Sequence, residues 1–200
     1  MRNEWLHSLK HVYKLDPNRS ITDEQLKRIA SSGTDAIMVG GTLGITYENT
    51  NELLRKMRKY ALPAPVIQEI SQLDAIVPGF DYYFIPFVLN AQNPDWILNA
   101  HHQAIKKYGD LINWDQVFVE GYVILNGQSS AAKLTNSKTD LYVEDVIAYA
   151  NMADQMLNLP ILYIEYSGQY GNLEWMKEIK KTVQTSRIFY GGGIQSAHQA

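Results

Sequence analysis

Cysteine is absent from the 200-residue sequence, which excludes disulfide bonds and thiolate metal sites. An excess of basic charge is absent too, because 18 Lys and Arg residues stand against 21 Asp and Glu residues and the formal net charge is -3. No run of basic residues compensates for this balance. The chain therefore offers no electrostatic basis for binding nucleic acid, and the lack of cysteine is compatible with the cytoplasmic location that we expect.

Long apolar runs are also missing. No segment approaches the ~18 consecutive apolar residues that a membrane span requires. The first residues, MRNEW, lack the apolar core of a signal peptide. Any membrane contact is therefore expected to be peripheral or to occur through a lipid substrate. The hydrophobic share of 46% is ordinary for a globular protein, and the length fits a single domain over residues 1–200.

Short apolar segments rich in β-branched residues alternate with helical patterns along the whole chain. The segments predict strands over residues 11–16, 35–39, 65–70, 82–89, 117–125, 161–166 and 187–190. Thr22, with Gln25 three residues later, predicts a capping box at the start of the first helix, and Asn49 or Thr50 is expected to cap the second. Further helices are expected over residues 94–108, 141–157 and 172–183, and an ordered loop or a mobile lid over residues 128–138.

This alternation predicts an α/β fold with a parallel sheet wrapped by helices. Seven βα units favour a TIM-like (β/α)8 barrel over an open doubly wound sheet, because no glycine-rich turn follows the first strand. A closed barrel needs an eighth strand and helix, roughly 30 residues more. The sequence ends at Ala200, so we interpret the barrel as truncated before strand eight, with its C-terminal βα unit absent. A seven-stranded barrel is the alternative.

Polar groups gather where the predicted strands end, and this is the edge at which barrels of this class bind substrates. The stretch Tyr163-Ile164-Glu165-Tyr166-Ser167-Gly168 closes the sixth strand. Successive side chains of a strand point to opposite faces, so Glu165 is expected on the same face as Tyr163 and Ser167. A carboxylate that points into a barrel mouth is costly unless it is paired or functional, so we expect Glu165 to have a role. Other strand ends supply Lys14, Asp16, Gly40, Gly41, Thr42, Asn90, Tyr122 and Asn126.

Two of these strand ends suit phosphorylated ligands. Gly191-Gly192-Gly193 follows the seventh strand, and three glycines allow a phosphate to approach backbone N–H groups, although a plain tight turn is the alternative. Asp16 and the hydroxyl of Thr42 are a plausible ligand pair for Mg²⁺, whereas Asp16 could instead cap the turn before Pro17. Lys14 would suit a phosphorylated substrate or a simple ion pair.

With these residues assembled, the sequence resembles a known family. Lys14-Leu15-Asp16-Pro17, Gly40-Gly41-Thr42, the stretch from Tyr163 to Gly168 and Gly191-Gly192-Gly193-Ile194 together resemble the geranylgeranylglyceryl phosphate synthase family. The greatest similarity is to its bacterial branch, the PcrB-type heptaprenylglyceryl phosphate synthases. The similarity covers essentially the whole chain.

The resemblance implies a TIM-like barrel, usually a homodimer, that uses Mg²⁺. It implies transfer of a long polyprenyl group, heptaprenyl in this branch, from its diphosphate to the C3 hydroxyl of sn-glycerol 1-phosphate, which forms an ether lipid precursor. Carried over by motif, Asp16 and Thr42 would bind Mg²⁺. The residues that would bind glycerol 1-phosphate are Lys14, Tyr163, Ile164, Glu165, Tyr166, Ser167, Gly168 and Gly193. The prenyl chain length rests on the resemblance alone.

A mechanism follows as a hypothesis from residues and resemblance together. Glu165 would act as the general base for the glycerol hydroxyl, and Tyr122 or Tyr166 would face the allylic centre as it ionises. A phosphosugar isomerase or aldolase barrel is a second interpretation, because it would use the same phosphate site after the seventh strand. A non-catalytic subunit that binds a phosphorylated ligand is a third.

Overall fold

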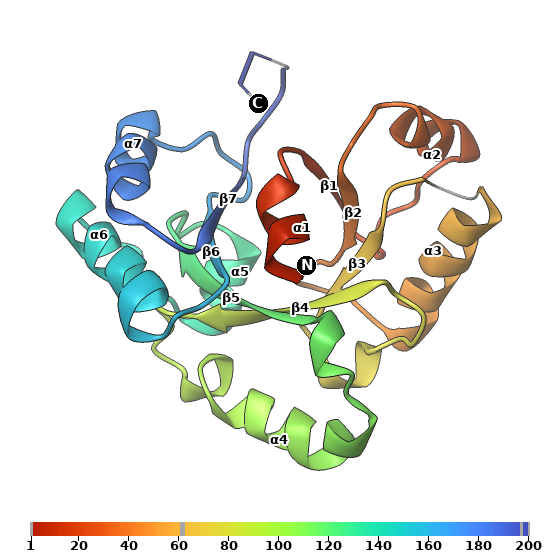
Figure 1. Cartoon of the computed structure of the whole chain (residues 1–200), viewed down its shortest axis with the longest axis horizontal. Helices are drawn as coiled ribbons and strands as arrows, with labels where there is room; N and C mark the ends of the chain where they lie inside the picture. The colour runs from red at the N-terminus through yellow and green to blue at the C-terminus, as the bar shows by residue number, and fades with distance from the viewer. Residues whose placement is uncertain (1, 61–62, 197, 200) are drawn as a thin grey trace. The chain divides into compact units, whose positions relative to one another are not determined.

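The computed structural model describes residues 2–60, 63–196 and 198–199. Within them lie seven parallel strands, which follow one another in the sheet in their sequence order (Figure 1). The strands are β1 Val12–Leu15, β2 Ala36–Val39, β3 Val66–Glu69, β4 Tyr82–Val88, β5 Val117–Ile124, β6 Ile161–Glu165 and β7 Arg187–Gly191. All seven were predicted within two residues at each end. A doubly wound sheet reverses its strand order, so the sequential order confirms the predicted topology of the barrel class.

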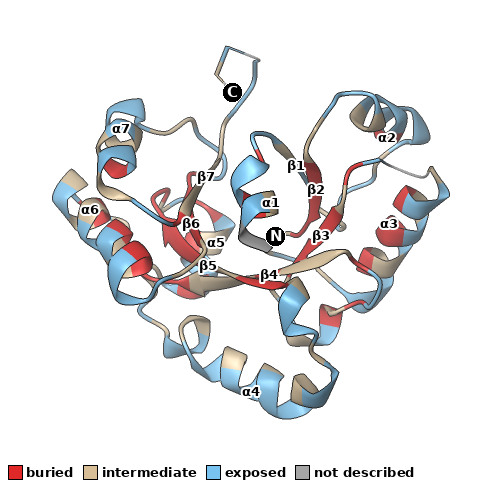
Figure 2. Ribbon diagram, viewed as in Figure 1, coloured by how far each residue is buried: buried red, intermediate tan, exposed pale blue. Residues whose placement is uncertain are grey.

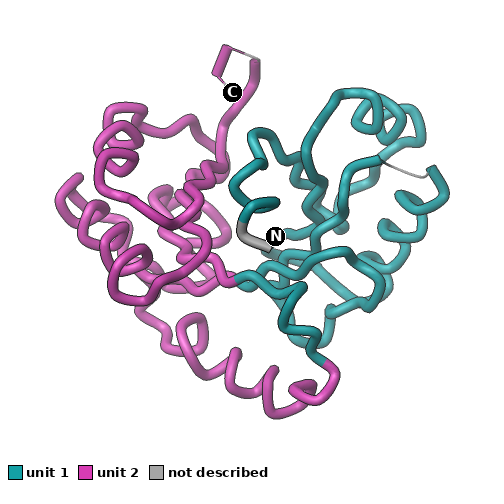
Figure 3. Tube along the Cα trace, viewed as in Figure 1, with its two compact units in different colours: residues 1–85, 112–118 teal, residues 86–111, 119–200 magenta. Residues whose placement is uncertain are grey.

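The chain forms two compact units (Figure 3). Unit 1 comprises Met1–Ile85 and Ile112–Phe118, and unit 2 comprises Pro86–Leu111 and Val119–Ala200. Strand β4 begins in unit 1 and ends in unit 2. No helix in the described part of the chain is long and apolar enough to cross a membrane.

The described residues of unit 1 form the α-helices α1 Arg2–Ser8, α2 Asp23–Ala30 and α3 Tyr47–Lys59. The predicted capping box of α2 is confirmed, since Thr22 Oγ1 accepts the Gln25 N–H at 3.2 Å and Gln25 Oε1 accepts the Thr22 N–H at 2.8 Å. The predicted start of α3 was wrong by three residues or more. Thr46 caps this helix, and its side chain accepts the Asn49 N–H. The Asn49 side chain in turn accepts the Thr46 N–H, which is the role that Glu or Gln has in the usual capping box.

Alternation along the strands gives the sheet of unit 1 two different faces. One face packs on α2 and α3 and buries Leu26, Ile37, Val39, Leu53, Leu54, Met57, Ala64, Val66, Val77 and Phe80 (Figure 2). The register places Lys14 beside Met38 on the opposite face, and Glu69 lies two residues beyond Ile67 on that face as well. Helix α1, which was not predicted, stacks Trp5 on Tyr82 with the ring centroids 3.9 Å apart. The face against the helices thus anchors the strands, and the other face carries the polar Lys14 and Glu69 near the carboxyl ends of β1 and β3 as well as the apolar Met38 and Ile67.

Unit 2 contains α4 Asn99–Tyr108, α5 Ser130–Thr135, α6 Val143–Asn151 with a π-helical continuation Met152–Met156, and α7 Leu173–Thr182. The bounds predicted for the last helix, 172–183, are confirmed within one residue, and Asn172 is the N-cap of α7. The fourth helix begins at Asn99 instead of residue 94, because Pro94 opens a separate 3-10 turn. The stretch 128–138 holds α5 and is ordered, since Asn90 Nδ2 donates to the Lys138 carbonyl at 2.8 Å. Short 3-10 helices in the two units span Leu73–Ala75, Pro94–Trp96, Gly109–Leu111 and Trp114–Gln116.

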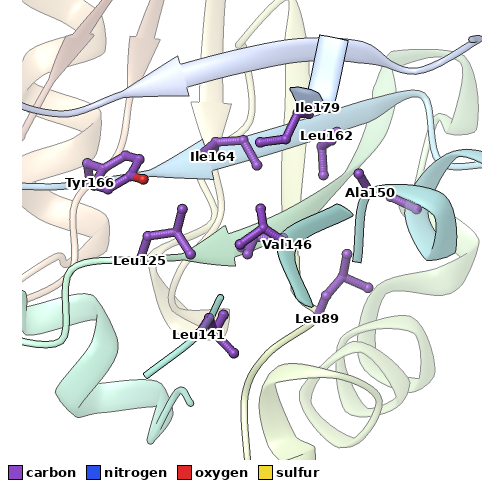
Figure 4. Packing of buried hydrophobic residues seen from close by; sticks show 11 residues of the cluster. Leu89, Leu125, Leu141, Val146, Ala150, Leu162, Ile164, Tyr166 and Ile179 are labelled. Carbon is purple, nitrogen blue, oxygen red and sulfur yellow. The ribbon is translucent and has the colours of Figure 1, made fainter. Parts of the chain in front are cut away.

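The core of unit 2 lies between β5–β7 and the helices α6 and α7 (Figure 4). Its buried members are Leu89, Val123, Leu125, Leu141, Val146, Ala150, Ala153, Leu162, Ile164, Tyr166 and Ile179. The register pairs Val123 with Ile164, so this face of the sheet is apolar. The opposite face carries Tyr122, Tyr163 and Glu165 by the same alternation.

Asp154 joins the π-helical turn to the segment that leads into β7. Its side chain is buried and accepts N–H bonds from Gln184 at 3.0 Å, Thr185 at 2.8 Å and Ser186 at 2.6 Å. Burial raises the pKa of this carboxyl, but the backbone hydrogen bonds outweigh burial and hold its pKa well below the ordinary value. The charged form of Asp154 therefore stabilises the folded state.

Replacing Asp154 with Asn is expected to destabilise the protein by about 2–3 kcal/mol at neutral pH, because an amide nitrogen would face backbone N–H donors. A depressed folded-state pKa stabilises the protein above the unfolded pKa of about 3.9 and loses that contribution as the pH falls. The difference between wild type and variant in urea unfolding should therefore shrink below about pH 4. The exposed Asp140→Asn is the matched control and should leave stability unchanged. A D154N protein as stable as wild type at pH 7 would contradict this role.

Candidate active site

In unit 1 an ion pair spans three strands at their carboxyl ends. Lys14 Nζ on β1 lies 2.7 Å from both carboxylate oxygens of Glu69 on β3. Strand β2 runs between β1 and β3, and the residue that follows it is Gly40. A Cβ at Gly40 would lie 2.7 Å from Glu69 Oε2, so only glycine leaves room for the carboxylate here. The ion pair therefore depends on the missing side chain of the middle strand.

Asp16 lies beside the glycine pair that follows β2. A Cβ at Gly41 would lie 2.8 Å from Asp16 Oδ1, so the carboxylate packs directly on this glycine. The Gly41 carbonyl accepts a bond from Ser71 Oγ at 2.7 Å, which fixes the turn from the β3 side. The Asn18 N–H donates to Asp16 Oδ1 at 2.9 Å, so the turn-capping contact considered from the sequence is present as well.

Asp16 and Thr42 have the types of oxygen atom that could hold a magnesium ion. Asp16 is partly accessible, with 30% of its side chain exposed, and Arg19 Nε is no closer than 3.6 Å to Oδ2. Each carboxylate oxygen can accept more than one contact, so the bond to Asn18 leaves acceptor capacity. Mg²⁺ commonly takes one or two protein oxygens and fills its shell with water and substrate phosphates. Thr42 is half-buried directly after Gly41 and adds a hydroxyl oxygen to this turn. No cluster of three or more acidic, His or Cys groups occurs among the residues described.

In unit 2 the carboxylate of Glu165 is held at both oxygens. Tyr122 donates its hydroxyl to Oε2 at 3.1 Å, and the Ser167 N–H donates to Oε1 at 2.5 Å. Glu165 is buried, with 4% of its surface exposed. A buried carboxylate needs such partners, and these two bonds fix its orientation. The prediction that Glu165 and Tyr163 share a strand face agrees with the register.

Tyr163 lies between the aromatic residues that flank it on β5 and β7. Its ring stacks on Tyr122 with centroids 4.3 Å apart and planes 10° apart, and it lies 6.2 Å from Phe189. A Cβ at Gly191 would meet the Tyr163 hydroxyl at 2.2 Å, so Gly191 leaves the space that this phenol occupies. The stack locks Tyr122 and thereby supports the Tyr122–Glu165 bond.

The glycine turn after β7 packs on the backbone of the loop after β6. Gly193 has φ of +63°, and a Cβ there would lie 2.2 Å from the Gln169 carbonyl carbon and from the Tyr170 nitrogen. The Tyr190 hydroxyl donates to the Gly192 carbonyl at 2.9 Å and accepts the Gly171 N–H at 2.8 Å. The two loops therefore form one close-packed backbone surface. Glycine at position 193 is therefore required for the packing of the two loops.

Two predicted residues have side chains on the other face of β6. Ile164 is fully buried in the hydrophobic cluster beside α6 and α7. Tyr166 belongs to the same cluster, and its ring lies under Gly171, where a Cβ would be 2.4 Å from two ring carbons (Figure 4). Burial raises the pKa of Tyr166, which keeps its hydroxyl protonated. Of the two tyrosines considered for the reacting centre, Tyr122 is the one that contacts Glu165.

Two residues that support the site were given no role from the sequence. Glu69 is the last residue of β3 and the second-last of the predicted strand 65–70, and the only available signal was a charged residue near the carboxyl end of an apolar segment. Asn126 was placed among the strand-end residues but without a role, and its Nδ2 donates to the Ser167 carbonyl at 2.6 Å. It thus fixes the loop whose N–H group binds Glu165.

Parallel strands that follow one another in sequence order define a protein of the TIM-barrel class. The model of the PcrB family matches residues 3–200, and the chain belongs to this family.

Curated relatives cover nearly the whole chain. A heptaprenylglyceryl phosphate synthase from Anoxybacillus flavithermus is 53% identical over 191 residues, which are 96% of this chain and 82% of the relative. Another protein of that name, from a Geobacillus species, is 50% identical over 96% of this chain and 83% of its own length.

Solved structures share the fold at low sequence identity. The wild-type GGGPS from Thermoplasma volcanium superimposes with a TM-score of 0.82 at 20% identity, over 100% of this chain and 83% of the other. The (S)-3-O-geranylgeranylglyceryl phosphate synthase from Thermoplasma acidophilum, solved with its substrate sn-glycerol-1-phosphate, gives 0.77 at 18% identity, over 98% and 90%. These similarities confirm the predicted TIM-like barrel fold.

Proposed function

We propose that this protein is a prenyltransferase that joins a long polyprenyl group to the C3 hydroxyl of sn-glycerol 1-phosphate. The observation that carries the proposal is membership of the PcrB family, together with relatives near 50% identity that are named heptaprenylglyceryl phosphate synthase. A structural neighbour solved with sn-glycerol-1-phosphate supports the acceptor substrate. The heptaprenyl chain length is proposed from the names of the relatives.

The residues of unit 2 suit the acceptor half of the reaction. The glycine turn Gly191–Gly193 and the loop after β6 would bind the phosphate of glycerol 1-phosphate through backbone N–H groups. Glu165 would accept the proton of the C3 hydroxyl as that oxygen attacks. Tyr122 holds Glu165 in place through its 3.1 Å bond and is a positioning residue for it.

The bond changes balance with these roles. The C3 oxygen of glycerol 1-phosphate bonds to the allylic carbon of the prenyl group, and the bond from that carbon to the diphosphate oxygen breaks. The proton passes to Glu165, and the diphosphate leaves with the bonding electrons. Positioning of the two substrates contributes much of the rate, because attack requires the hydroxyl close to the allylic carbon.

The residues of unit 1 suit the donor half. Asp16 and Thr42 would hold Mg²⁺, which when bound neutralises charge on the diphosphate leaving group. Lys14 is the exception in this unit, because its ammonium, which pairs with Glu69, would bind glycerol 1-phosphate. Gly41 is essential to this arrangement, because a side chain there would displace the Asp16 carboxylate.

The proposed magnesium site is tested by replacing Asp16 and measuring Mg²⁺ binding. Replacing Asp16 with Asn should weaken Mg²⁺ binding about tenfold or more, because a neutral amide replaces the only carboxylate in the proposed pair. Calorimetric titration of Mg²⁺ into the protein measures this directly, and activity should require higher Mg²⁺ in the variant. Arg19→Gln is the control, since Arg19 is 85% exposed and lies 3.6 Å from the same carboxylate. Equal Mg²⁺ affinity in wild type and D16N would remove Asp16 from the metal site.

The reaction itself is tested with labelled sn-glycerol 1-phosphate and a series of prenyl diphosphates. The expected result is label in a solvent-extractable lipid, formed fastest with the heptaprenyl donor. Absence of product with every donor would favour the isomerase or binding-subunit interpretations, which share the phosphate site but need no prenyl donor. If a prenyl diphosphate of another length reacted fastest, only the proposed length of the prenyl group would change.

Two further properties are proposed, the first of them from the family resemblance. The protein is proposed to be a homodimer, which light scattering of the purified protein measures as twice the mass of one chain. A cytoplasmic location is proposed from the lack of cysteine and is tested by cell fractionation.

A further inference from the structure

We infer that Glu69 is a positioning residue that holds the Lys14 ammonium in place for a substrate phosphate. This inference rests on the proposed function, because it assigns Lys14 a phosphorylated ligand. The contact that carries it is the ion pair of Lys14 Nζ with both carboxylate oxygens of Glu69 at 2.7 Å.

The two partners differ in their access to solvent. The Glu69 side chain is only 4% exposed, whereas the Lys14 side chain is 32% exposed. The carboxylate is therefore an interior anchor, and Lys14 is the partner whose side chain is partly accessible from solvent. A Lys ammonium has three N–H donors, so pairing with one carboxylate is compatible with a simultaneous bond to a phosphate oxygen.

Fixing the ammonium has a physical benefit for binding. A lysine side chain has many rotamers, and a lysine without a fixed partner would lose that conformational entropy on binding an anion. Glu69 imposes that order during folding, so less is lost when the ligand binds. This role differs from a stabilising surface ion pair, because its effect appears in ligand affinity.

The lack of a side chain at Gly40 supports a specific role for the contact between Glu69 and Lys14. Glu69 reaches Lys14 across β2, where a Cβ on Gly40 would lie 2.7 Å from Oε2 and 2.8 Å from the Glu69 Cβ. A side chain at this position would therefore push the carboxylate away from Lys14. A core glutamate that served only to fill space would not require an open path to the lysine two strands away.

The first test compares Glu69→Gln, Lys14→Met and the double variant by calorimetric Kd for sn-glycerol 1-phosphate, with KM and kcat measured alongside. Glu69→Gln should raise Kd and KM about tenfold and change kcat less than about threefold. In the Lys14→Met background the same change should have less than about a twofold effect, because Glu69 acts through Lys14. Additive losses, or an unchanged Kd in E69Q, would overturn the inference.

Gly40→Ala provides a second test that leaves both charges in the chain. Its Cβ should displace the Glu69 carboxylate and raise Kd and KM as Glu69→Gln does. Glu174→Gln is the matched control for Glu69→Gln. Glu174 Oε1 also lies 2.7 Å from a lysine, Lys177 Nζ, but the Glu174 side chain is 75% exposed. G40A with wild-type affinity would contradict the proposed geometry. A wild-type protein that binds no glycerol 1-phosphate would instead refute the proposed function.

Discussion

Replacing Glu165 with Gln is expected to lower kcat by about 10²–10⁴-fold while the Kd for sn-glycerol 1-phosphate changes little. The amide keeps the size of the side chain and can still accept the Ser167 N–H, which now bonds Oε1 at 2.5 Å. It cannot accept the hydroxyl proton, so binding survives and proton transfer does not. Single-turnover kinetics with saturating prenyl diphosphate measure the chemical step, and calorimetry measures binding.

Tyr122→Phe separates positioning from proton transfer. It removes the 3.1 Å bond to Glu165 Oε2 but leaves the ring stacked on Tyr163. We expect a kcat loss of about tenfold, smaller than that of E165Q, because the Ser167 bond still orients the carboxylate. An E165Q enzyme with wild-type kcat would exclude Glu165 as the base, whatever Tyr122→Phe shows.

Replacing Gly193 with Ala should raise the Kd for sn-glycerol 1-phosphate by about 10–100-fold. The added Cβ would lie 2.2 Å from the backbone of Gln169 and Tyr170, so one of the two loops must move. Backbone atoms cannot rotate away as a flexible side chain can, and the proposed phosphate cradle is made of these two loops.

Gly33→Ala is the matched control for this variant. Gly33 has φ of +74°, close to the +63° of Gly193, but a Cβ there meets nothing within 4 Å. Both variants carry the backbone strain of an alanine in the left-handed region, about 1 kcal/mol, and only Gly193→Ala adds the collision. Equal affinity in the two variants would show that the turn after β7 does not bind the phosphate.

Local patterns predicted much of the fold. Each strand was found because a short apolar segment ends at a polar or glycine residue, and Thr22 with Gln25 contains the whole capping motif in four residues. Helix α1 was not found, because it is short and its contact, Trp5 on Tyr82, joins positions far apart in the sequence. The start of α3 was misplaced because its capping box has Asn49, and not Glu or Gln, at the third helical position.

The candidate site was predictable to the extent that strand ends reveal it. Alternation placed Glu165 and Tyr163 on one face, and the structure agrees. The same alternation puts Tyr166 on the other face, where it packs in the core, so its proposed role at the reacting centre came from side-chain chemistry alone. Glu69 could not be identified as the partner of Lys14, because that pairing depends on strand order and on the open path at Gly40.

The absent side chains at Gly40 and Gly191 have a consequence for altering substrate preference. At each position a neighbouring strand's polar group, Glu69 in one case and Tyr163 in the other, occupies the volume that a side chain would fill. The two members of each pair are therefore coupled, because enlarging the glycine displaces the crossing side chain unless that side chain is shortened in the same variant. Libraries that vary one residue at a time would discard those combinations, so reshaping this enzyme calls for paired codon changes across adjacent strands.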